Sequence, residues 1–123
     1  MLIYYAHCKA IYDTPQEKRD IELLEKLGFR VLNPNHSEHQ ANCMSYSHIT
    51  GNNEMVYFYD LVRSCDAVAF RALPTMEIPA GVYGEVTEAI KEGKLIIELP
   101  SRILTRGIDV ETTREYLKEC GQR

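Results

Sequence analysis

The feature that most constrains this chain is a regular alternation of short apolar runs with helical patterns. The runs at 2–6, 29–33, 66–72 and 94–100 are rich in β-branched and aromatic residues and show no helical period, as in buried strands. Parallel strands joined by helices form a sheet that is covered on both faces. The alternation therefore predicts an α/β, flavodoxin-like (Rossmann-like) three-layer sandwich. We expect a parallel sheet of four or five strands in the order 2-1-3-4(-5), with a weak fifth strand near 102–108.

Helix signals separate these runs. Thr14, Pro15 and Glu17 form a capping box that predicts a helix to about Leu27, followed by a left-handed stop at Gly28. An apolar stripe predicts a second helix near 53–64, and a third follows the turn at 78–81. We expect a last helix, capped by Asp109, that offers apolar side chains for packing: Val110, Tyr116 and Leu117.

The segment 34–53 has no apolar period and is rich in Asn, Ser and His, so we expect an unusually long loop. Its potential zinc ligands are His36, His39, Cys43 and His48. Their spacing matches no closed four-ligand pattern, which favours a polar lid over the alternative of a metal site. We therefore expect neither a metal nor any other cofactor.

Size and charge restrict the class of protein. A chain of 123 residues suits a single domain over 1–123, and no apolar run reaches the roughly 18 residues of a membrane span. The start of the chain lacks a basic segment before its apolar run, and the four cysteines form no CxxC pair, so we expect a cytoplasmic protein with reduced thiols. A net charge of -4 with dispersed Lys and Arg argues against nucleic-acid partners.

Ligands of parallel sheets collect at the carboxyl ends of the strands. The corresponding loops begin near Ala6, Asn33, Ala72 and Pro100. We therefore expect His7, Cys8, the His-rich segment and the stretch 78–90 to line any site.

Glu85 is the most informative residue of the stretch 78–90. The helical period places it on the flank of the apolar face, beside Ala89, where it borders the core. We expect it in the first helical turn, where free N–H groups favour a carboxylate that is ionised at neutral pH. Such a carboxylate suits a nucleophile or an electrostatic anchor, although acidic residues also occur in first turns for the dipole alone.

The stretch from 81 to 99, GVYGEVTEAIKEGKLIIEL, resembles the nucleophile segment of the nucleoside 2-deoxyribosyltransferase superfamily. This superfamily includes the 2'-deoxynucleoside 5'-phosphate N-hydrolases. The matching positions are Gly81, Val82, Glu85, Ala89, Gly93 and Lys94. The start, IYYAHCK, is similar to the strand-one motif of the family, which places Tyr4 on its substrate-contacting tyrosine. His7 and Cys8 then occupy positions that the family usually fills with Gly and with Ser or Pro.

The resemblance implies a reaction. Glu85 would attack C1' of a nucleoside or nucleotide as the base departs, and water would then release the sugar, as in retaining glycosidases. A second base as acceptor would make the protein a deoxyribosyltransferase. The alternatives are a non-catalytic nucleotide-binding module and an enzyme that cleaves NAD or processes cyclic nucleotides. By resemblance we also expect a homodimer.

The resemblance also suggests other site residues. The position of a family aspartate aligns with Phe58, and the nearest acid is Asp60, so Asp60 and His7 are the candidate proton donors. Pro79 stands where the hydrolases carry a phosphate-binding serine and the transferases an aspartate. We expect the substrate to contact two groups of residues, which are Tyr4, His7 and Cys8 after strand one, and Pro79, Ala80, Gly81 and Val82 at the turn.

Overall fold

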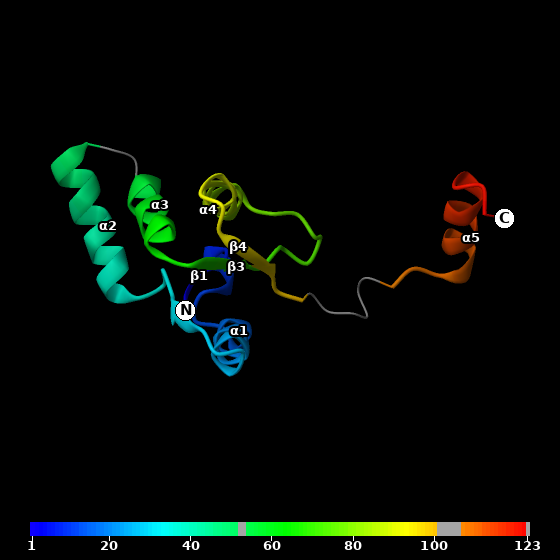
Figure 1. Cartoon of the computed structure of the whole chain (residues 1–123), viewed down its shortest axis with the longest axis horizontal. Helices are drawn as coiled ribbons and strands as arrows, with labels where there is room; N and C mark the ends of the chain where they lie inside the picture. The colour runs from blue at the N-terminus through cyan, green and yellow to red at the C-terminus, as the bar shows by residue number, and fades with distance from the viewer. Residues whose placement is uncertain (52–53, 101–106, 123) are drawn as a thin grey trace.

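A computed structural model describes residues 1–51, 54–100 and 107–122 of the chain. Its four strands form one parallel sheet in the order β2-β1-β3-β4. The strands are β1 (Leu2–Ala6), β2 (Arg30–Leu32), β3 (Ala67–Phe70) and β4 (Leu95–Glu98). The sheet and its flanking helices confirm the flavodoxin-like α/β fold and the predicted order of four strands (Figure 1). The weak fifth strand expected near 102–108 falls mostly on residues 101–106, outside the described part of the chain.

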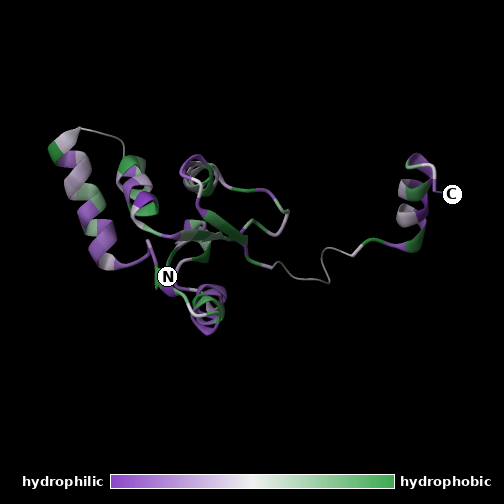
Figure 2. Ribbon diagram, in the orientation of Figure 1, coloured by the Kyte–Doolittle hydropathy of each residue, from purple (hydrophilic) through white to green (hydrophobic). Residues whose placement is uncertain are grey.

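Helices cover both faces of the sheet. Helix α1 (Pro15–Lys26) lies on one face, and α3 (Glu54–Ser64) and α4 (Ala80–Lys91) lie on the other (Figure 1). Because alternate strand residues point to opposite faces, Tyr4 joins the core beneath α3 and α4, whereas Tyr5 joins the core beneath α1. Figure 2 shows hydrophobic colour along the strands between these helices. The sheet therefore has two separate cores, and only the one under α3 and α4 adjoins the site described below.

The ends of α1 form as the sequence predicts. The Thr14 hydroxyl accepts a hydrogen bond from the Glu17 backbone N–H at 3.4 Å, and Gly28 follows the helix with φ of 95°. A short 3-10 helix, η1 (Lys9–Ile11), precedes it in the loop after β1. The capping box thus fixes where α1 begins, which in turn fixes the loop that carries His7 to Tyr12.

The segment 34–53 is not the long loop that the sequence suggests. Its residues form helix α2 (Ser37–Thr50), which packs beside α3 (Figure 1). The His36 side chain caps its start by accepting from the Glu38 backbone N–H at 3.2 Å, and Gly51 ends it with φ of 72°. The helix buries only Cys43, so it needs no apolar stripe, and its sequence shows none.

The last helix, α5 (Val110–Glu119), begins where the sequence predicts. The Asp109 carboxylate accepts from the Thr112 backbone N–H at 2.7 Å. Its apolar side chains are not packed as expected, since Val110 is 67% exposed and Tyr116 is 62% exposed. The sequence pattern of α5 therefore predicts the helix itself, but not a surface of the protein on which its apolar side chains pack. In the described part of the chain, no helix has the length and apolar content that crossing a bilayer requires.

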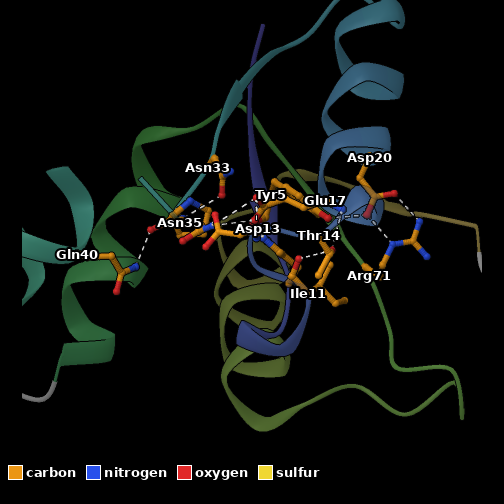
Figure 3. Close-up of polar contacts among 12 residues, drawn as sticks. Tyr5, Ile11, Asp13, Thr14, Glu17, Asp20, Asn33, Asn35, Gln40 and Arg71 are labelled. Atoms are coloured by element: carbon orange, nitrogen blue, oxygen red, sulfur yellow. Dashed lines mark hydrogen bonds and ion pairs between the residues drawn. The ribbon is translucent and has the colours of Figure 1, made fainter. Parts of the chain in front are cut away.

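A buried ion pair joins α1 to the residue directly after β3 and was not expected from the sequence. The Arg71 guanidinium donates to both Asp20 carboxylate oxygens, at 2.5 and 2.6 Å (Figure 3). It also donates to the Pro100 carbonyl oxygen. The Tyr5 hydroxyl donates to the same carboxylate at 2.5 Å. Burial alone would lower the pKa of Arg71, but the bonds to Asp20 outweigh it and raise the pKa. Both charges are thereby satisfied inside the α1 core.

Candidate active site

A cavity of about 290 Å³ opens at the carboxyl edge of the sheet, on the side of α3 and α4. The loop after β1, the first turn of α4 and one face of α3 form its walls. Seven of the nine residues that the sequence suggested for the site line this cavity: Tyr4, His7, Cys8, Pro79, Gly81, Val82 and Glu85. A cavity thus lies at the carboxyl edge, where ligands of parallel sheets usually bind.

Glu85 is buried in the wall of the cavity and does not lie at the edge of the core. It is the sixth residue of α4, so it is beyond the first turn, and only 6% of it is exposed. The Tyr4 hydroxyl, which is fully buried, donates a short hydrogen bond to Glu85 Oε2. The sequence expectation of a first-turn carboxylate at the edge of the core is therefore wrong in both position and burial.

This burial changes the charge of Glu85. Desolvation raises the pKa of Glu85 to about 7, although the hydrogen bond from Tyr4 acts in the opposite direction. The expectation of a fully ionised group at neutral pH is also wrong, because the protonated and ionised forms are then similarly populated. Burial, together with the neighbouring charge of Glu85, also raises the pKa of Tyr4 well above its usual range. Tyr4 therefore stays protonated as the donor.

Gly84 sets the position of the helix that carries Glu85. A Cβ at this residue would lie 2.3 Å from the Tyr59 hydroxyl oxygen and 3.2 Å from the ring carbon that bears it. The absence of a side chain at residue 84 therefore lets the Tyr59 hydroxyl lie directly against α4. The spacing of α3 and α4 places Glu85 next to the strand residue Tyr4.

His7 lines the cavity, but both of its ring nitrogens are already bonded. Nδ1 lies 3.0 Å from the Tyr5 carbonyl oxygen and Nε2 lies 2.7 Å from Glu17 Oε2. Both ring nitrogens are therefore engaged with protein groups inside the domain. Its ring also stacks on Tyr5 with centroids 3.7 Å apart. His7 is therefore a structural wall of the cavity, and its N–H groups are not directed to a ligand there.

Glu17 completes this buried pair. Burial would raise the pKa of Glu17, but hydrogen bonds from His7, the Asn35 amide and the Asp13 backbone N–H outweigh it and lower the pKa (Figure 3). Glu17 therefore stays ionised and holds His7 as its partner. The capping-box residue thus has a second role in supporting the loop after β1.

Asp60 and Ala80 lie outside the cavity. Asp60 is exposed and forms a surface ion pair with Arg63. Phe58 of the same helix lines the cavity, and two further residues turn the helix by about 200°, which directs Asp60 away from it. Asp60 is therefore not placed to protonate a ligand there. Ala80 is exposed at the start of α4, between two residues that do line the cavity.

Five cavity residues were missed by the sequence interpretation: Lys9, Tyr12, Pro34, Met55 and Phe58. Tyr12 is half-buried, and burial and then the charge of Glu85 raise its pKa to about 12. Lys9 is exposed at the cavity, and both residues belong to the loop after β1, which the carboxyl-edge rule already marked. The sequence also pointed to the position of Phe58, since Phe58 aligns with an aspartate of the superfamily that the chain resembles.

The cavity combines one carboxylate with aromatic rings from Tyr4, Tyr12 and Phe58. A single buried carboxylate with an oriented donor suits a nucleophile or an anchor for positive charge. Within residues 1–51, 54–100 and 107–122, no three His, Cys, Asp or Glu side chains gather where they could hold a metal ion. The chemistry of the site therefore centres on Glu85.

Comparison with known proteins does not assign the chain to a family. Neither a scan against models of known protein families nor a search of curated proteins finds a match. The function of the cavity is therefore inferred from its own chemistry, together with the motifs noted in the sequence.

Proposed function

We propose that this protein cleaves the N-glycosidic bond of a nucleoside or nucleotide, with Glu85 as the nucleophile and water as the final acceptor. The observation that supports this function best is the buried Glu85 carboxylate, held by Tyr4 in the wall of the cavity. Removal of the carboxylate from water strengthens its interaction with a developing positive charge. A glycosyl carbon acquires such a charge as its base departs.

The reaction proceeds in two steps. Ionised Glu85 forms a bond to C1' as the C1'–N bond breaks, and the base leaves with the electron pair. Water then attacks C1', which releases the sugar and returns Glu85 as a carboxylate, with one proton passing to solvent. Because Tyr4 donates to Oε2, Oε1 is the oxygen that attacks.

The dimensions and lining of the cavity fit this class of substrate. A volume of about 290 Å³ is near the lower limit for small-molecule pockets, which are roughly 300–1,000 Å³. The rings of Tyr12 and Phe58 provide apolar walls on which a flat base can stack. The site is therefore suited to one nucleoside and not to a polymer.

The direct test is to incubate the protein with deoxynucleosides, ribonucleosides and their monophosphates and to measure free base by chromatography. We expect release by the wild type and a loss of at least about 10³-fold in Glu85→Gln, since the nucleophile is removed. Glu22→Gln, at an exposed position of α1, is the matched control and keeps full activity. Base exchange that requires an added acceptor base would support a transferase instead. No release, together with equal ligand binding by wild type and Glu85→Gln, would leave only a binding module.

The covalent step has its own test. A 2'-fluoro nucleoside slows the second step, so the intact protein should gain the mass of the fluorosugar. After digestion, the added mass should be found on the peptide that contains Glu85. Glu85→Gln should gain no mass. Release of base from this compound by the wild type without any mass gain would refute the glycosyl-enzyme and indicate direct attack by water.

A further inference from the structure

Among the residues that the structure describes, the cavity contains the proposed nucleophile but no suitable acid for the leaving base. A neutral base departs as an anion unless a group of suitable pKa protonates it. Among the described residues that line the cavity, Glu85 is the only carboxyl group. The Asp60 carboxylate is in a surface ion pair, and the His7 N–H groups are directed to Tyr5 and Glu17.

The remaining proton-bearing side chains of the cavity are poor donors. Tyr4 gives its hydrogen to Glu85, and burial raises the pKa of Tyr12 to about 12. Lys9 is exposed and Cys8 is half-buried, and amines and thiols are weaker acids than carboxyl or imidazolium groups. The described cavity therefore favours a base that leaves without taking up a proton.

The lining also favours a positively charged ligand. Rings of Tyr4, Tyr12 and Phe58 lie around one carboxylate, and aromatic faces attract cations most strongly where water is excluded. Glu85 is 6% exposed, so its negative charge is poorly screened by solvent. A flat cationic ring thus has both stacking surfaces and a counter-charge in the same cavity.

We infer, on the basis of the proposed function, that the preferred substrates are N-glycosides whose base carries a fixed positive charge, such as pyridinium nucleosides and N7-alkylated purine nucleosides. In the first step the C1'–N electron pair returns to the ring nitrogen, which removes the positive charge of the base. The base departs neutral and needs no proton, while Glu85 forms the ester. In the second step water supplies oxygen to C1' and releases one proton to solvent, so charge and atoms balance.

A binding experiment tests the charge preference without any turnover. The probes are 1-methylnicotinamide, a pyridinium cation, and nicotinamide, its neutral analogue, and neither contains a glycosidic bond. At pH 8, where Glu85 is mostly ionised, the wild type should bind the cation at least about tenfold more tightly. The preference should disappear in Glu85→Gln and decrease several-fold in Phe58→Leu. Equal affinity of the wild type for both probes would overturn the inference.

An activity experiment separates this inference from the proposed function. The matched substrates are 7-methylguanosine and guanosine, with nicotinamide riboside as the pyridinium case, and each rate is divided by its uncatalysed rate. We expect an enhancement at least about 100-fold larger for the charged bases, since no acid serves the neutral one. Equal enhancement of guanosine would refute the charge preference and leave the glycosidase intact. Cleavage of no nucleoside would refute the glycosidase, whereas the binding probes would still report whether the cavity selects cations.

Discussion

Replacement of Glu85 by Gln should stabilise the protein, and increasingly so as the pH rises. Glu85 is 6% exposed and its pKa is raised from 4.5 to about 7, mainly by burial. Between these values the folded protein binds more protons than the unfolded chain. The free energy of unfolding therefore falls as the pH rises through this window. The folded state is most stable with Glu85 protonated and least stable above pH 7.

The size of this effect follows from the same two values. A rise from 4.5 to about 7 corresponds to about 3 kcal/mol at 1.4 kcal/mol per unit of pKa. Glu85→Gln removes the titration, and the amide oxygen of Gln still accepts from the Tyr4 hydroxyl. The variant should therefore equal the wild type in stability near pH 4.5 and exceed it by about 3 kcal/mol at pH 8.

Urea denaturation at pH 4.5, 5.5, 6.5, 7.5 and 8.5 measures this difference. Glu22→Gln changes an exposed carboxylate on α1 and serves as the matched control, for which we expect no pH-dependent difference. Over the same range, base release by the wild type should rise as Glu85 ionises, so activity should increase where stability falls. A difference between Glu85→Gln and wild type that is constant with pH, or that favours the wild type above pH 7, would refute the assigned burial of this carboxylate.

Three further substitutions test the surrounding structure, each by denaturation in urea. Gly84→Ala should destabilise the protein by about 1–3 kcal/mol, because the added methyl group clashes with the Tyr59 hydroxyl. Tyr59→Phe in the same chain should recover part of this loss. A Gly84→Ala variant as stable as the wild type would contradict the close approach of the two residues. Asp20→Ala should cost about 3–5 kcal/mol because it leaves Arg71 buried without a partner, whereas Asp20→Leu with Arg71→Met should cost much less. Glu17→Gln should be less stable than the wild type at pH 7, because the folded state lowers the pKa of Glu17. The difference in stability should shrink as the pH falls below 4.5. A difference that grows in acid would contradict the lowered pKa of Glu17.

The strands and most helices were predictable because local patterns encode them. Thr14 and Gly28 bound α1 through capping and left-handed geometry, which depend on a few neighbouring residues. The parallel sheet covered on both faces followed from the alternation of elements and the handedness of crossovers, and the strand order was that of a flavodoxin-like fold. Helix α2 was missed because it buries little beyond Cys43, and without a buried face a helix leaves no apolar period in its sequence.

The sequence predicted the edge of the sheet at which the cavity lies and most of the residues that line it, but not the electrostatics of Glu85. Glu85 was identified from its motif and from the edge of the sheet that carries it. Its raised pKa arises from packing between strand β1 and helices α3 and α4, which no local pattern records. The choice of Asp60 failed for a related reason, since sequence proximity to Phe58 does not bring two residues to the same helical face.

The hydrogen bond between Tyr4 and Glu85 crosses from one structural layer to another. Tyr4 is on a central strand that is hydrogen-bonded to a neighbouring strand on each side, whereas Glu85 is on a helix held by side-chain contacts, including the Arg63–Glu88 ion pair to α3. Loosening of that packing lengthens this bond before the sheet itself opens. On heating, the proposed base release should therefore be lost at a lower temperature than the circular dichroism of the fold.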